Sequence, residues 1–118
     1  MITKGEFERA RDFLILHRAD YEHAYTHFEW PRVNYFNWAS DYFDRMAEGN
    51  NNIALRIIDE AGKEEKYSFA DMSLRSNQVA NYLRKLGLRK SDSVLLMLDS
   101  EVARWEIMLA VMKLGAVL

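Results

Sequence analysis

The sequence predicts an α/β fold, in which an N-terminal helical extension precedes a β-hairpin and then the first β/α units of an incomplete sheet. Three observations support this prediction. Residues 1–48 carry apolar side chains at helical spacing. Residues 53–67 read as two short strands around a loop, and residues 68–118 read as helix, strand, helix and the start of another strand. We therefore expect a helical, aromatic-rich extension over residues 1–48 and the start of a large α/β domain over residues 49–118, truncated at Leu118.

The extension is expected to begin with a helix that ends near Arg18. Thr3 and Glu6 have the spacing of a capping box, in which two side chains satisfy the free N–H groups at the start of a helix. The helix-spaced face that follows comprises Phe7, Ala10, Leu14 and His17.

Two further helices are expected before residue 49. The aromatic residues at helical spacing in the first of them are Tyr21, Tyr25 and Phe28. Trp30-Pro31 ends this helix, because the residue before a proline is pushed out of the helical region. Either Asn34 or Asn37 can cap the next helix. The apolar residues expected on that third helix are Phe36, Ala39, Phe43 and Met46.

A turn cluster at residues 49–52 leads into a predicted hairpin. Ile53–Ile58 is a short strand rich in β-branched residues, Asp59–Lys63 is a loop, and Glu64–Tyr67 is the return strand. A helix then begins after Ser68, because Asp71 lies three residues on and completes a capping box. Its apolar stripe comprises Phe69, Met72, Val79, Leu83 and Leu86, and Gly87 is placed for a left-handed cap.

The last part of the chain is expected to begin a parallel sheet. Val94–Leu98 is a continuous apolar run, which is typical of a strand buried on both faces of such a sheet. Asp99-Ser100 ends the run and caps a helix over Glu101–Leu114, which Gly115 ends, and Ala116–Leu118 starts a strand without a partner. The helix is apolar almost all round, as interior helices are. Because 118 residues supply too little to cover it, we interpret the chain as the beginning of a larger protein.

Composition excludes several classes of function. The net charge of −2 gives no basic footprint for nucleic acid. The chain has no cysteine, which excludes disulfides and thiol nucleophiles. No apolar run approaches the roughly 20 residues of a membrane span. The N-terminus lacks the pattern of a secretory signal, so we expect a cytoplasmic protein.

Candidate ligand sites in the sequence each have a simpler structural interpretation. Phosphate loops need clustered glycines, and no two of the five glycines lie within ten residues of each other. A zinc site could be formed by His23 and His27, with His17 and Glu29 as further ligands. We favour the interpretation that the histidines form a polar face of a helix. We therefore predict no catalytic, cofactor-binding or metal-binding residue in this segment.

The remaining charged and aromatic groups are also interpreted structurally. The acidic pairs Asp59-Glu60 and Glu64-Glu65 flank a hairpin loop and are expected to be solvated. The cations near a helix end are Arg84, Lys85, Arg89 and Lys90, and they complement the helix dipole. Nine of the fifteen aromatic residues fall between Tyr21 and Phe43. We interpret this stretch as an extension that docks on a larger domain, and we expect an exposed apolar patch, through which copies could associate, where that domain is missing.

Several segments together resemble the N-terminal region of the AMP-forming acyl-CoA synthetases. The segments in the α/β part are Tyr67-Ser68-Phe69-Ala70-Asp71, Ser76 to Leu83, Leu86 to Asp92, Val94 to Leu98 and Met112 to Val117. In the extension, Phe28-Glu29-Trp30-Pro31 and Phe36-Asn37-Trp38-Ala39 resemble the leader of the medium-chain branch. Two positions depart from the pattern: the family often has glycine at the position of Ser91 and a basic residue at that of Ser93.

The resemblance implies a parent enzyme that uses ATP, magnesium and coenzyme A. In that family a carboxylic acid reacts with ATP to give an acyl-adenylate and pyrophosphate, and coenzyme A then displaces AMP to form a thioester. None of the family's diagnostic motifs matches this sequence, so no catalytic or binding residue is carried over. We therefore expect an N-terminal fragment, inactive alone, whose partner is the remainder of the synthetase.

Two alternatives remain at this point. The chain could be a truncated, non-catalytic interaction module that docks to a full-length synthetase. It could also belong to another adenylate-forming ligase, which passes its adenylate to an acceptor other than coenzyme A. The acyl substrate and its chain length cannot be inferred from these residues.

Overall fold

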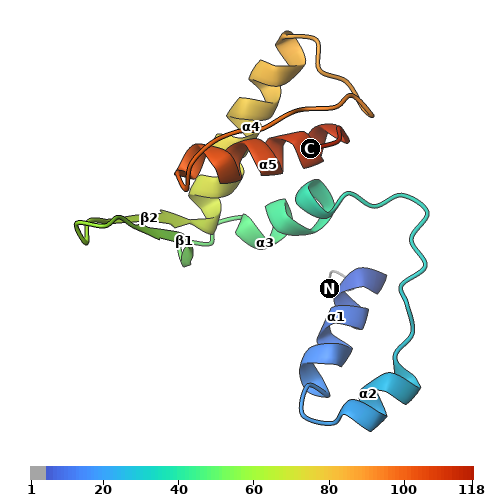
Figure 1. Cartoon of the computed structure of the whole chain (residues 1–118). Helices are drawn as coiled ribbons and strands as arrows, with labels where there is room; N and C mark the ends of the chain where they lie inside the picture. Colours follow the sequence, from blue (N-terminus) through green and yellow to red (C-terminus); the bar gives the residue numbers. More distant parts are fainter. Residues whose placement is uncertain (1–4) are drawn as a thin grey trace. The chain divides into compact units, whose positions relative to one another are not determined.

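The computed structural model describes residues 5–118, which form two compact units. One unit ends at Phe36 and contains α1 (Glu6–Leu16) and α2 (Tyr21–His27). The other is Asn37–Leu118 and contains the remaining elements, labelled in Figure 1. These elements are η1 (Trp38–Phe43), α3 (Asp44–Ala47), β1 (Ile53–Ile58), β2 (Glu64–Ser68), α4 (Phe69–Lys85) and α5 (Val102–Leu114). Helices combined with a small sheet agree with the predicted partial α/β fold.

The helices of the first unit begin at caps made by short local hydrogen bonds. α1 follows Gly5, whose backbone N–H donates to the Glu8 carboxylate at 2.8 Å. Thr3, the predicted cap, lies outside the described residues. α2 begins after Asp20, whose carboxylate accepts the backbone N–H of His23 at 3.0 Å. As predicted, the first helix ends near Arg18 and the second ends before Trp30-Pro31.

The third helix begins after Asn37, which is one of the two predicted caps. It is a π-helical turn, η1, that continues directly into the short α3. The placement of Phe36 on this helix was wrong. Asn37 has an extended backbone as the N-cap, so Phe36 precedes the helix, and its ring stacks on that of Phe7 with centroids 4.9 Å apart.

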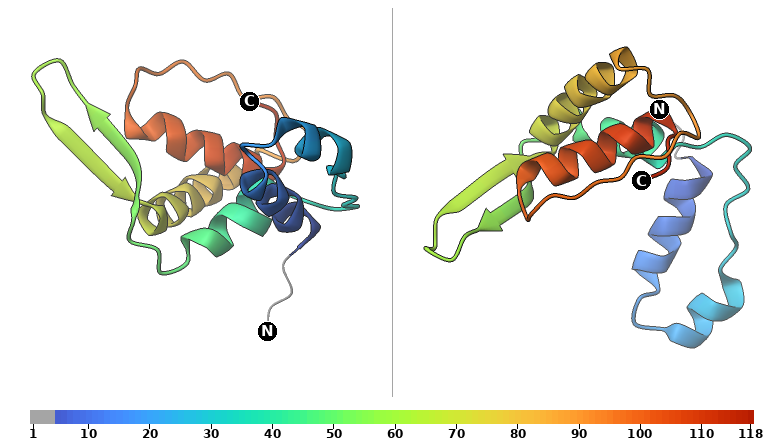
Figure 2. Two further views of the ribbon diagram at one scale, coloured as in Figure 1. Left: turned by 90° about the horizontal axis from the view of Figure 1, so that it is seen from below. Right: turned by 45° about the horizontal axis from the view of Figure 1, so that its top comes forward.

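The hairpin and the capping of α4 confirm the prediction. β1 pairs antiparallel with β2, with Leu55 opposite Tyr67 and Ile58 opposite Glu64. α4 follows Ser68 directly, ends at Lys85 and lies along α5, as Figures 1 and 2 show. Gly87 lies just beyond α4 at φ +99°, a left-handed conformation that suits glycine.

The predicted strand over Val94–Leu98 does not form in this chain. The segment is extended, but its parallel pairing is confined to one bridge between Ser93 and Val117. Leu95 and Met97 are 98% and 91% exposed, so the segment is not covered on both faces. No strand of the described residues lies along its other edge, and a strand without a neighbour has no ladder to join.

The predicted cap of the last helix was also wrong. Glu101, and not the Asp99-Ser100 pair, is the N-cap of α5, and its side chain makes no capping hydrogen bond. At the other end, Gly115 ends α5 as predicted, at φ +67°.

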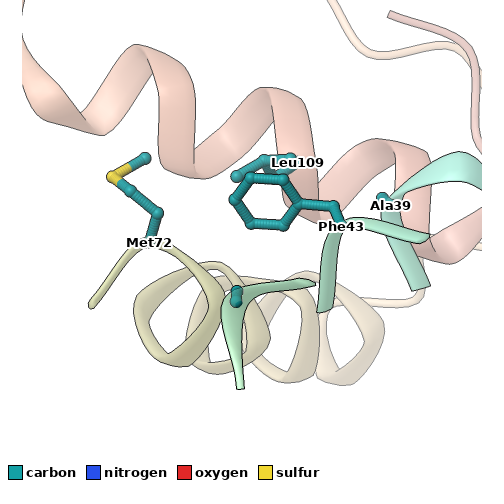
Figure 3. Close-up of a cluster of buried hydrophobic side chains, with 5 residues drawn as sticks. Ala39, Phe43, Met72 and Leu109 are labelled. Carbon is teal, nitrogen blue, oxygen red and sulfur yellow. The ribbon is translucent and has the colours of Figure 1, made fainter. Parts of the chain in front are cut away.

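The core lies where η1, α4 and α5 meet. Figure 3 shows the ring of Phe43 beneath Leu109 of α5, with Met72 of α4 nearby. The buried cluster comprises Ala39, Phe43, Ala47, Met72 and Leu109. On α5, however, Trp105 and Met112 remain 42% and 38% exposed, as expected for a helix that this chain cannot cover. No helix in the described part of the chain is long and apolar enough to cross a membrane.

Candidate functional site

A cluster of polar side chains around Lys113 joins α5 to α4 and α3. The side chain of Lys113 is only 7% exposed. Its ammonium donates to the Asp44 carboxylate at 2.7 Å, to Asn77 Oδ1 at 2.8 Å and to Ser76 Oγ at 2.9 Å. A longer bond, 3.3 Å, reaches the backbone carbonyl of Ser73. Because Lys113 donates all of these bonds, the cluster holds its side chain in place between α5, α4 and α3.

Asn37 makes a second polar connection to the same end of α5. Its Nδ2 donates to the carbonyl of Met112 at 2.7 Å, and its Oδ1 accepts the backbone N–H of Ala39 at 3.0 Å. The carboxamide therefore caps the start of η1 and the end of α5 together. The sequence predicted the first role and gave no sign of the second, which joins residues 75 positions apart.

The third connection between helices is an ion pair that sequence reasoning missed. Glu106 of α5 is buried, and its carboxylate pairs with the guanidinium of Arg75 on α4. A carboxylate that is buried away from water needs such a partner. The sequence did contain one signal of this ion pair. Glu106 is an acidic residue within the apolar run of α5, and its burial requires a cation on the neighbouring helix.

The capping box of α4 perturbs the carboxyl group of Asp71. Ser68 donates to this carboxylate from its hydroxyl at 2.6 Å and from its backbone N–H at 2.9 Å. These hydrogen bonds favour the charged form and lower the pKa of Asp71 below its ordinary 3.8. This carboxyl group is exposed and caps the start of α4. We therefore interpret its lowered pKa as a consequence of helix capping and not as a sign of a catalytic site.

The acidic residues of the hairpin are held as carboxylates by their neighbours. Arg56, with Lys66, lowers the pKa of Glu64 below 4.5. The Tyr67 hydroxyl donates to Glu65 at 2.8 Å and lowers the pKa of that carboxyl, while the same bond raises the pKa of the tyrosine. A general acid near neutral pH needs a raised carboxyl pKa. The shifts run the other way, as expected for loop carboxylates rather than an acid–base pair.

The three histidines lie close together in the first unit. The ring of His23 lies 4.2 Å from that of His17 and 4.3 Å from that of His27, measured between centroids. The Nδ1 atom of His27 lies 3.0 Å from the carbonyl oxygen of His23. Among residues 5–118, no group of three histidine or acidic side chains is arranged to hold a metal ion.

The basic residues around the end of α4 make local contacts through their side chains or their backbone. Arg84 donates to Asn81 Oδ1 at 2.8 Å, and the backbone N–H of Arg89 donates to the Asp92 carboxylate at 2.7 Å. The side chain of Lys90 lies beside Gly115, where an added Cβ would come within 3.2 Å of it. These contacts belong to the turn after α4 and do not gather the cations into one anion site.

A shallow groove of about 790 Å³ lies within the first unit. Its polar lining residues are Glu6, Arg9, His27, Glu29 and Arg32. Trp30 forms part of its wall and is 82% exposed, with its ring edge-on to Phe28 at 5.2 Å. Because two arginines and two glutamates line it, the groove favours neither an anion nor a cation.

Comparison with known proteins identifies relatives for most of the chain. A family model described as AMP-binding enzyme matches residues 43–118. The 4-hydroxybutyrate--CoA ligase 1 of Metallosphaera sedula is 41% identical over 86 residues, or 70% of this chain and 15% of that protein. The acetyl-coenzyme A synthetase of Bacillus subtilis is 34% identical over 110 residues, or 83% of this chain and 19% of that protein.

A third relative matches a similar share of the chain. The acyl-coenzyme A synthetase ACSM4, mitochondrial, of Rattus norvegicus is 33% identical over 105 residues, or 83% of this chain and 18% of that protein. The chain therefore spans less than a fifth of the length of each of these three relatives.

Proposed function

Because the chain belongs to the AMP-binding enzyme family, we propose that it supplies the opening part of the large domain of an AMP-forming acyl-CoA synthetase. In this proposal residues 49–118 begin the domain and residues 1–48 are an extension to it. The complete enzyme joins a carboxylic acid to coenzyme A, consumes ATP and releases AMP and pyrophosphate. The observation that carries the proposal is the agreement of three relatives, each named as a CoA ligase or synthetase, over 70–83% of the chain.

We infer that the chain alone does not catalyse this reaction. The glycines do not form a phosphate loop, because those at Gly49, Gly62, Gly87 and Gly115 occupy isolated left-handed positions. We therefore assign the segment a structural role in the enzyme and derive no catalytic step from it. We place the enzyme in the cytoplasm, which a chain without cysteine suits.

A chimaera tests the structural role. This chain replaces the corresponding segment of the Bacillus subtilis acetyl-coenzyme A synthetase, and acetyl-CoA and AMP are measured with acetate, ATP, Mg²⁺ and coenzyme A. The matched control carries the corresponding segment of the Metallosphaera sedula ligase. We expect both chimaeras to form acetyl-CoA. If the control is active and a folded chimaera with this chain is not, the proposed function is wrong.

The second candidate, an interaction module, is favoured by the exposed aromatic residues of the first unit. Trp30 and Tyr35 are 82% and 96% exposed. Such a module binds a full-length synthetase in solution and remains monodisperse alone. Our first proposal predicts instead that the free chain exposes enough apolar surface to bind a hydrophobic dye and to self-associate. Light scattering and dye fluorescence on the purified chain separate the two.

A further inference from the structure

We propose that Asn37 is a positioning residue, whose side chain fixes the last turn of α5 and through it the parallel bridge between Ser93 and Val117. The consequence for the enzyme rests on the proposed function, because this bridge is then the point from which the parallel sheet of the large domain extends. The bridge itself and its dependence on Asn37 are properties of the 118-residue chain.

Asn37 uses both ends of its carboxamide. The Oδ1 atom accepts the backbone N–H groups of Ala39 at 3.0 Å and Ser40 at 3.4 Å. The Nδ2 atom donates to the carbonyls of Met112 at 2.7 Å and Lys113 at 3.4 Å. Helix ends leave such N–H and carbonyl groups without partners inside the helix. One side chain therefore binds the start of η1 to the end of α5.

The connection continues from α5 to the bridge through a short, hydrogen-bonded segment. Gly115 ends α5 in the left-handed conformation, and its carbonyl accepts the N–H of Ser91 at 2.9 Å. Two residues on, the N–H of Val117 donates to the carbonyl of Asp92 at 2.8 Å, and its carbonyl accepts the N–H of Val94 at the same distance. Only four residues lie between Met112, which Asn37 binds, and Val117, so a shift of the last turn of α5 displaces the bridge.

The requirement for asparagine follows from its chemistry. An aspartate at the same position keeps the acceptor for η1, and its charge suits a helix N-terminus. It has no donor for the carbonyl of Met112, and its oxygens would face that carbonyl. The pair of variants Asn37→Asp and Asn37→Ala therefore separates the two functions of the side chain.

The test is amide hydrogen exchange of the full chain, followed residue by residue by NMR. In Asn37→Asp we expect the amides of Val94 and Val117 to exchange about tenfold faster, as loss of one hydrogen bond implies. The amides of Ala39 and Ser40 should stay within about twofold, because their acceptor remains. In Asn37→Ala all four amides should accelerate.

The control is Asn50→Asp, which makes the same change of charge in a turn. Asn50 donates to the Met46 carbonyl at 3.2 Å and accepts the Asn52 N–H at 3.1 Å, and both bonds lie near the turn that precedes β1. This control should leave Val94 and Val117 unchanged. The proposal is overturned if Asn37→Asp leaves these two amides unchanged, or if it accelerates all amides of the chain equally.

A measurement on the unaltered chain covers the case in which the variants do not fold. The side-chain NH₂ protons of Asn37 should exchange more slowly than those of the exposed Asn51. Equal exchange at the two sites overturns the proposal. Because none of these readouts measures ligase activity, their outcome is independent of the chimaera test.

Discussion

The two units of the chain carry nearly equal numbers of aromatic residues, but the aromatic side chains pack differently in each unit. The described residues through Phe36 carry eight of the fifteen aromatic side chains and none of them is buried. The unit Asn37–Leu118 carries the other seven and contains the buried cluster around Phe43. The number of aromatic residues therefore determines how much apolar surface a segment could bury. Whether that surface is buried depends on which helices and strands pack together.

The number of elements that meet explains this difference. In the first unit, rings stack between near neighbours such as Tyr21 and Tyr25, and also between Phe7 and Phe36, which lie far apart in the sequence, yet none of these rings is buried. In the second unit, η1, α4 and α5 come together from distant parts of the chain, and Lys113 reaches Asp44 across 69 positions. Three elements around one point exclude water, whereas two short helices leave their rings at least partly exposed.

The largest predicted effect is the loss of the central ring of the second unit. Phe43→Ala should reduce the free energy of unfolding by about 4 kcal/mol, because it removes a buried ring and leaves a cavity. Trp30→Ala, the control in the first unit, should change it by less than about 0.5 kcal/mol, as exposed substitutions do. Urea unfolding followed by circular dichroism measures both. Equal effects would contradict the distinction between the units.

The next largest effect concerns the polar cluster of the second unit. Lys113→Met should cost about 3 kcal/mol, because it leaves Asp44, Ser76 and Asn77 without their shared donor. The control Lys63→Met removes an ion pair whose lysine side chain is 72% exposed and should cost less than about 1 kcal/mol. The same unfolding experiment applies. A Lys113→Met protein of unchanged stability would show that the Lys113 cluster does not contribute to holding α5 on α4.

A smaller effect of opposite sign is expected at Ser91. Its φ of +72° is strained for a residue with a Cβ. Ser91→Gly should therefore stabilise the chain by about 0.5–1 kcal/mol. Ser93→Gly, two residues on at the bridge, should not stabilise it. Thermal unfolding of the two variants gives the comparison, and a destabilised Ser91→Gly protein would refute the assignment of strain.

The smallest effect is a pH dependence at the start of α4. The pKa of Asp71 is lower in the folded chain than its ordinary 3.8, so the unfolded chain binds this proton more readily. The contribution of the carboxylate is thus complete above pH 3.8 and is lost as the pH falls through the lower folded value. NMR titration of Asp71 should show the lowered midpoint, and Ser68→Ala should return it towards 3.8. An unchanged midpoint in that variant would mean that the capping box does not cause the shift.

Local patterns predicted the local structure well. The strand Ile53–Ile58, the capping box at Ser68 and the glycine at the end of α5 each depend on neighbouring residues, and each was confirmed. The segment Val94–Leu98 has the composition of a buried strand, but its pairing depends on strands elsewhere, which the described residues do not provide. The sequence pattern therefore identified a segment with the composition of a strand, but it could not identify the strands that would pair with it.

The polar connections to α5 depend on long-range geometry and were therefore harder to predict. Asn37 was one of the two predicted helix caps, because that role involves residues two and three positions away. Its bond to Met112, the pair of Arg75 with Glu106 and the cluster around Lys113 join residues 31 to 75 positions apart. A single sequence does not indicate which distant residues pair with each other. It indicates only that a buried charge needs a partner.

Hydrogen–deuterium exchange of the whole chain, measured by mass spectrometry of its peptides, tests the central claim most directly. We predict slow exchange in peptides from α4 and α5, which surround the buried cluster, and fast exchange in peptides from α1 and α2, which bury no residue. Protection in α1 and α2 equal to that in α4 would contradict the account, because it would place a second stable core in the first unit.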